Sequence, residues 1–144
     1  MKLPVKPVRL PADLRHIEPG KLPNYLLKSI RPYGNLHPLA AQAWEAMRRA
    51  AHQAGIRPFK PTSVADTYRT LEAQEKGFMA RYTLAPIANS TSVRTWRGQK
   101  WYLKTGLAPM ATPGTSIHNL GLAVDVSDAN GLRLQWMIDN CDKY

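Results

Sequence analysis

The residues best suited to chemistry lie within residues 113–126. His118 and Asp125 occur there, and Asp125 lies within the short apolar run of residues 120–126. In a regular strand, two residues with this separation point to opposite faces and lie roughly 23 Å apart. Both side chains could bind one metal ion only if the chain turns back between them. Asn119 and Gly121 are residue types that permit such a turn.

A second interpretation of this stretch stays open when the residues are taken alone. His118 would then be a loop histidine, and Asp125 would cap or hydrogen-bond the turn that follows it. A carboxylate in a buried strand is costly unless it is paired or bound to a cation. Because Cys141 is the only cysteine, a metal site here must be built from His, Asp or Glu.

Two motifs carry a family resemblance. The pattern S-x-H-x-x-G-x-A-x-D is reproduced in order by Ser116, His118, Gly121, Ala123 and Asp125. This is the motif of the zinc D-Ala-D-Ala carboxypeptidase family, which includes VanY-like carboxypeptidases and phage endolysins that cleave L-Ala-D-Glu bonds. Upstream, residues 68–70 (Tyr-Arg-Thr) with Gln74 resemble the family's Y-R-[ST] segment and the glutamine that follows it. The resemblance runs over about residues 21–144.

The resemblance implies a role for each matching residue. His118 and Asp125 would be zinc ligands. Arg69 would be the catalytic residue that holds a substrate carboxylate or polarises the scissile carbonyl, a role that suits a planar, permanently charged guanidinium. A surface position at the start of a helix is the alternative for Arg69. The substrate-binding residues would be Ser116, Gln74, Tyr68 and Trp101.

Trp101 belongs to a segment, residues 94–104, in which basic and aromatic residues alternate. The aromatic rings would anchor a long loop to the core, form the wall of a substrate groove beside anionic wall polymers, or stack on single-stranded nucleic acid. Because of the peptidase motif, we prefer the groove wall to nucleic acid.

The family's site also requires a histidine as third ligand and a glutamate as general base, both in a Glu-x-x-His segment. The printed sequence contains no such segment. We therefore expect a C-terminally incomplete version of the fold, whose activity depends on a third ligand and a general base that residues 1–144 do not supply. A non-catalytic cell-wall-binding or virion structural protein on the same scaffold is the alternative function.

The elements that must position these residues predict an α+β fold, with helices packed on a small antiparallel sheet that carries the metal ligands. Residues 1–35 are rich in proline and predict an extended segment, whereas residues 36–144 predict one compact domain. Apolar periodicity and capping residues predict helices over 38–54, 70–82 and 132–144. The expected strand is 120–126, and the expected long irregular connection is 83–115.

Charge and hydropathy define the expected setting. The formal charge of +10 favours approach to polyanions such as anionic wall polymers or nucleic acid. No run approaches the roughly 18 apolar residues of a membrane span, and the first residues lack the apolar core of a signal peptide. We expect a phage lysin or virion-associated lysin that is made in the host cytoplasm, acts at the bacterial cell wall and takes peptidoglycan stem peptides as its substrate.

Overall fold

The computed structural model describes residues 2–144 and contains three α-helices within that range. They are α1 (Pro38–Gln53), α2 (Leu71–Arg81) and α3 (Gly131–Asn140). The predicted helices thus form with small differences at their ends. None of the helices in this described range has the length and apolar character needed to cross a membrane.

Side-chain caps explain where the first two helices begin. The Nδ1 atom of His37 accepts a hydrogen bond from the Leu39 amide at 3.2 Å at the start of α1. The hydroxyl of Thr70 accepts one from the Ala73 amide at 3.1 Å at the start of α2. Each cap satisfies an amide that has no partner within its own helix.

Two small antiparallel sheets complete the α+β fold that the sequence predicts. One pairs β1 (Lys28–Ser29) with β2 (Asn35–Leu36). The other has the order β3-β5-β4 and is built from β3 (Tyr82–Thr83), β4 (Val93–Trp96) and β5 (Gln99–Leu103).

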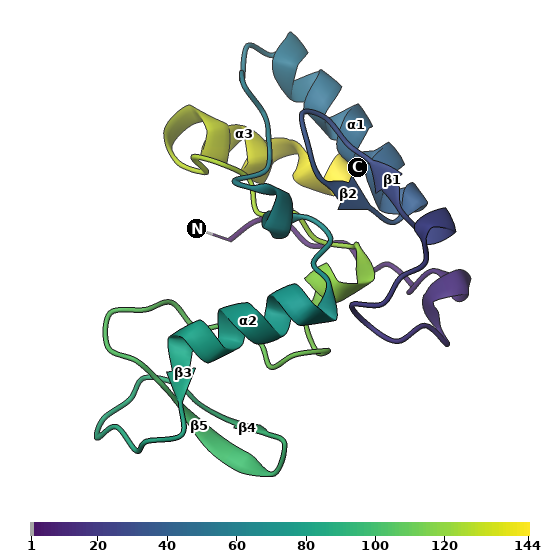
Figure 1. Cartoon of the computed structure of the whole chain (residues 1–144). Coiled ribbons are helices and arrows are strands. Elements are labelled where there is room, and N and C mark those ends of the chain that lie inside the picture. The colour runs from purple at the N-terminus through teal and green to yellow at the C-terminus, as the bar shows by residue number, and fades with distance from the viewer. Residues whose placement is uncertain (1) are drawn as a thin grey trace.

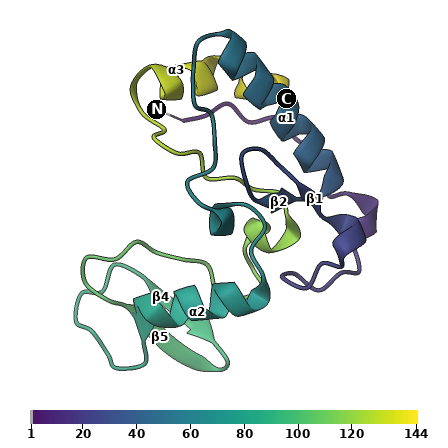
Figure 2. The same ribbon diagram turned by 45° about the horizontal axis from the view of Figure 1, so that its top comes forward.

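The helices and sheets gather at two ends of the molecule. Figure 1 shows α1 and α3 at one end with the β1–β2 pair beside α1, while α2 and the three-stranded sheet form a lobe at the other. The same separation is seen after the rotation in Figure 2. A short 3-10 helix, Ile117–Leu120, lies where the two ends meet. The candidate histidine therefore sits at the junction between the two parts of the fold.

Aromatic rings dominate the core at each end. Phe59 is fully buried, with ring centroids 5.4 Å from Trp44 and 5.5 Å from Trp136. In the lobe, Phe78 stacks on Tyr82 with a centroid separation of 4.4 Å. Burying such large rings contributes much of the apolar stabilisation of a small core.

The prediction of an irregular connection over residues 83–115 is wrong in part, because β3, β4 and β5 lie at its start and within it. The last two strands form a hairpin whose connecting residues, Arg97 and Gly98, have φ values of +52° and +71°. Positive φ at both positions is typical of the two-residue turns that match the twist of an antiparallel pair. The Arg-Gly pair between β-prone residues was the signal that the sequence analysis missed.

The prediction of a strand over residues 120–126 is also wrong. Leu120 ends the 3-10 helix, and the following chain makes one isolated antiparallel bridge, between Val126 and Pro61. The metal-ligand candidates therefore lie on a 3-10 helix and an extended segment rather than on a sheet. In α3, Leu132 is 81% exposed, whereas Met137 is buried against the core.

Candidate active site

His118 and Asp125 are brought together by a reversal of the chain. The Nε2 atom of His118 lies 3.3 Å from Oδ2 of Asp125, against the roughly 23 Å of an extended chain. Gly121 makes the reversal with a φ of +69°, and its carbonyl accepts a hydrogen bond from the His37 amide at 2.9 Å. A Cβ at this glycine would lie 2.7 Å from the His37 nitrogen. The glycine of the motif is thus required both by conformation and by space.

The histidine ring has a defined orientation. Its Nδ1 lies 2.9 Å from the carbonyl oxygen of Thr67. A carbonyl can only accept, so Nδ1 carries the hydrogen and, in the neutral ring, Nε2 presents its lone pair to Asp125. Two lone-pair atoms at 3.3 Å repel each other unless a proton or a metal ion lies between them. A backbone acceptor behind a histidine is the arrangement that orients metal-binding imidazoles.

Asn119 connects the histidine turn to the segment that carries Arg69. Its side chain is fully buried, and Nδ2 donates to the Arg69 carbonyl at 2.8 Å. Its Oδ1 accepts from the Ser116 amide at 3.3 Å, while Ser116 Oγ accepts from the His118 amide at 3.2 Å. The Arg69 amide in turn donates to the His118 carbonyl at 3.0 Å. These bonds fix the two motif segments in one register.

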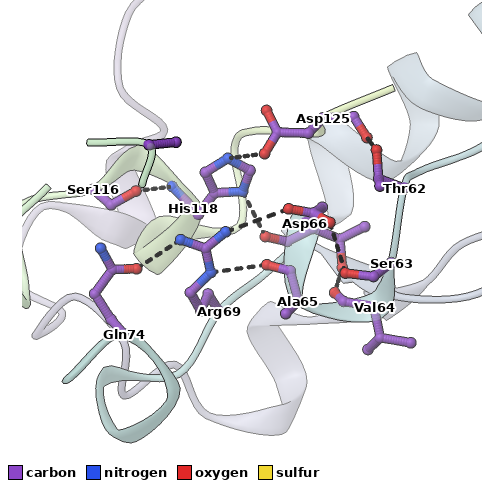
Figure 3. Close-up of polar contacts among 12 residues, drawn as sticks. Thr62, Ser63, Val64, Ala65, Asp66, Arg69, Gln74, Ser116, His118 and Asp125 are labelled. Atoms are coloured by element: carbon purple, nitrogen blue, oxygen red, sulfur yellow. Dashed lines mark hydrogen bonds and ion pairs between the residues drawn. The ribbon is translucent and has the colours of Figure 1, made fainter. Parts of the chain in front are cut away.

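The Arg69 guanidinium is held from three sides, as Figure 3 shows. Nε donates to the Ala65 carbonyl at 2.9 Å, and one terminal nitrogen donates to Gln74 Oε1 at 2.8 Å. The other terminal nitrogen lies 3.6 Å from Oδ1 of Asp66. Gln74 is fully buried and is itself fixed by a bond to the Ala111 carbonyl at 2.8 Å. A side chain held in this way needs little reorganisation to bind a substrate oxygen.

These side chains share one cavity of about 330 Å³. Of the residues predicted for the site, the cavity is lined by Arg69, Gln74, Ser116, His118 and Asp125. Two further charged residues, Asp66 and Arg81, line its wall and were not predicted from the sequence. For Asp66 the available signal was its place three residues before Arg69, within a short turn.

Tyr68 and Trp101 lie outside this cavity. The Tyr68 hydroxyl accepts a hydrogen bond from the Leu22 amide at 3.1 Å, and its ring packs against a buried leucine cluster. Trp101 packs edge-on against Phe78 in the lobe, and its indole N–H donates to the Trp96 carbonyl at 3.1 Å. Both rings contact the protein interior in this structure.

Two donors of the site fit a zinc ion. Ligands about 2.0–2.1 Å from a tetrahedral zinc lie roughly 3.3 Å apart, which is the separation of His118 Nε2 and Asp125 Oδ2. Asp125 is exposed, so its carboxylate is accessible from solvent. Within residues 2–144, no group of three or more His, Cys, Asp or Glu side chains is arranged to hold a metal.

Comparison with known proteins identifies the family. A family model described as VanY, D-alanyl-D-alanine carboxypeptidase, matches residues 34–143. The match spans most of the chain, and the chain belongs to this family. No curated protein and no solved structure matches it. Membership supports a peptidase that acts on peptidoglycan, and it confirms the resemblance based on the two motifs.

Proposed function

We propose that this chain is a zinc-dependent peptidase that cleaves the stem peptides of peptidoglycan, as part of a phage lysin or virion-associated lysin. The observation that carries the proposal is the pair of His118 Nε2 and Asp125 Oδ2, 3.3 Å apart in a cavity that Arg69 also lines. The formal charge of +10 supports a role at an anionic cell wall.

His118 and Asp125 would hold the zinc ion. When bound, such an ion supplies a Lewis acid and a water acidic enough to act as a nucleophile near neutral pH. The bond from His118 Nδ1 to the Thr67 carbonyl would leave the Nε2 lone pair available to bind the ion. The family's third ligand and general base lie in a Glu-x-x-His segment, a pattern that the sequence of residues 1–144 does not contain.

Arg69 would bind and orient the substrate. Its terminal nitrogens contact Gln74 and Asp66, and each carries a second N–H that can donate to a substrate oxygen. A carboxylate or the scissile carbonyl could take these donors, and the positive charge would stabilise negative charge that develops on the carbonyl oxygen. Asp66 offsets part of this charge, so the arginine can be desolvated in the cavity at lower cost.

Ser116 and Gln74 would contribute positioning. The Ser116 oxygen accepts from the His118 amide, so its own hydrogen can be donated to a substrate carbonyl or carboxylate. Gln74 acts through Arg69, because its oxygen accepts from the guanidinium while one N–H of its amide donates to the Ala111 carbonyl and fixes the side chain.

One observation favours the second candidate, a cell-wall-binding protein without catalytic activity. Within the described residues, the ligand set stops at two side chains. A two-ligand site would bind zinc weakly and would lack a base for the attacking water. Such a protein would retain recognition of the stem peptide without hydrolysis.

Hydrolysis of defined stem peptides separates these candidates. The wild-type chain, His118→Ala and Arg69→Gln would be incubated with zinc and with peptides that contain either the D-Ala-D-Ala or the L-Ala-D-Glu bond, and product masses would identify the cleaved bond. Cleavage by wild type that both variants abolish supports the peptidase. Wall binding by wild type without cleavage of either peptide supports the binding protein.

A further inference from the structure

Arg81 is a second arginine in the wall of the active-site cavity. It ends α2 seven residues after Gln74, so the two lie on the same face of the helix. The segment 108–111 runs along this face, since Gln74 donates to the Ala111 carbonyl and Arg81 donates to the Ala108 carbonyl. The cavity therefore extends along α2 from the motif residues to the end of the helix.

Over the described range, the charge of Arg81 has no acidic partner. In the same range its side chain makes one hydrogen bond, to the Ala108 carbonyl, which is long at 3.4 Å. Among residues 2–144, no carboxylate lies within salt-bridge distance of it, whereas Arg69 faces Asp66 at 3.6 Å. Arg81 is half-buried. A half-buried guanidinium that lines a cavity without a counter-charge is suited to an anion from outside the chain.

We propose that Arg81 binds a second carboxylate of the substrate, so that the site selects acidic stem peptides over neutral ones. This inference rests on the proposed function and deepens it. Seven helical residues separate the Cα atoms of Gln74 and Arg81 by roughly 10 Å. An extended peptide advances about 3.3–3.6 Å per residue. With Arg69 on the scissile carbonyl, the carboxylate bound by Arg81 therefore belongs to a residue about three positions from the cleaved bond.

A structural role for Arg81 makes a different prediction. A cation in the last turn of a helix stabilises the helix whatever peptide is bound. Such a role would change the affinity for acidic and neutral peptides equally. The ratio of the two affinities is therefore the quantity that reports a direct contact with the second carboxylate.

The test measures the affinity of two matched peptides by calorimetry, one carrying the carboxylate three residues from the cleaved bond and one with that group amidated. The proteins are wild type, Arg81→Gln, Arg81→Lys and, as a control for loss of charge on the same helix, Lys76→Gln, whose exposed side chain lies outside the cavity. Wild type and Lys76→Gln should bind the acidic peptide about five- to tenfold more tightly than the amidated one. In Arg81→Gln the ratio of the affinities for the acidic and the amidated peptide should fall to about one, while the affinity for the amidated peptide stays that of wild type. Arg81→Lys should recover part of the preference for the acidic peptide.

Equal affinities in wild type, or a preference that survives in Arg81→Gln, would overturn the role of Arg81. If both peptides bind wild type equally well, the proposed function stands and only this inference fails. If neither peptide binds, both the inference and the proposed function are overturned.

Discussion

Removal of the Asn119 side chain should destabilise the fold at the point where the two motif segments meet. In Asn119→Ala the Arg69 carbonyl and the Ser116 amide both lose their hydrogen-bond partner. Because Asn119 is fully buried, water cannot readily replace the bond to Arg69. A buried group left without a partner costs about 1–3 kcal/mol, and Ser116 is only half-buried, so its amide should cost less. We expect the free energy of unfolding to fall by about 2–4 kcal/mol.

Urea denaturation followed by circular dichroism measures this change as a shift of the midpoint. Asn130→Ala is the matched control, because Asn130 is exposed at the start of α3 and makes no side-chain capping bond. Its effect should stay within about 0.5 kcal/mol. Asn119→Asp keeps an acceptor for Ser116 but places a carboxylate oxygen against the Arg69 carbonyl, so it should destabilise at least as much as Asn119→Ala. A loss below about 0.5 kcal/mol in Asn119→Ala would refute the claim that this amide joins the segments.

Two further predictions concern stability. Gly121→Ala should lower the free energy of unfolding by more than about 2 kcal/mol, because its φ is left-handed and the added Cβ would lie 2.7 Å from the His37 nitrogen. Gly106→Ala is the control, since Gly106 has a φ of +82° but open space around it. It should lower the free energy of unfolding by only about 1 kcal/mol in the same urea assay. Burial, helped by the charges of Arg48 and Arg57, lowers the pKa of His52, whose Nε2 accepts from the Phe59 amide at 3.0 Å. The unfolded chain therefore binds more protons at His52 than the folded chain does. The stability that neutral His52 contributes is present above the ordinary pKa of 6.5 and is lost as the pH falls through the folded-state pKa. His52→Gln should lose less stability than wild type between about pH 7.5 and about pH 5, and an unchanged pH dependence would contradict this.

The helices were predictable because their signals are local. The N-cap threonine of α2 and the apolar spacing of α1 depend on residues within one or two turns, and the helices form where these signals place them. The hairpin of β4 and β5 also had a local signal, the pair Arg97-Gly98. It was hidden in a segment whose composition is typical of irregular chain.

The sequence predicted which residue types form the site, but it did not predict the contacts among them. Motif spacing indicated that the chain must turn between His118 and Asp125, and Gly121 makes that turn. The contact of Arg69 with Asp66 and the place of Arg81 in the cavity depend on how α2 packs against residues 108–111. That packing is tertiary, and no spacing along the chain encodes it.

The central claim is that His118 and Asp125 form a zinc site, and a calorimetric zinc titration tests it most directly. The titration would compare wild type, His118→Ala, Asp125→Ala and, as a control, Asp128→Ala, whose exposed side chain lies outside the cavity. The account predicts one zinc per chain for wild type and Asp128→Ala, and a loss of at least tenfold in affinity for the other two variants. Zinc binding that neither His118→Ala nor Asp125→Ala weakens would contradict it.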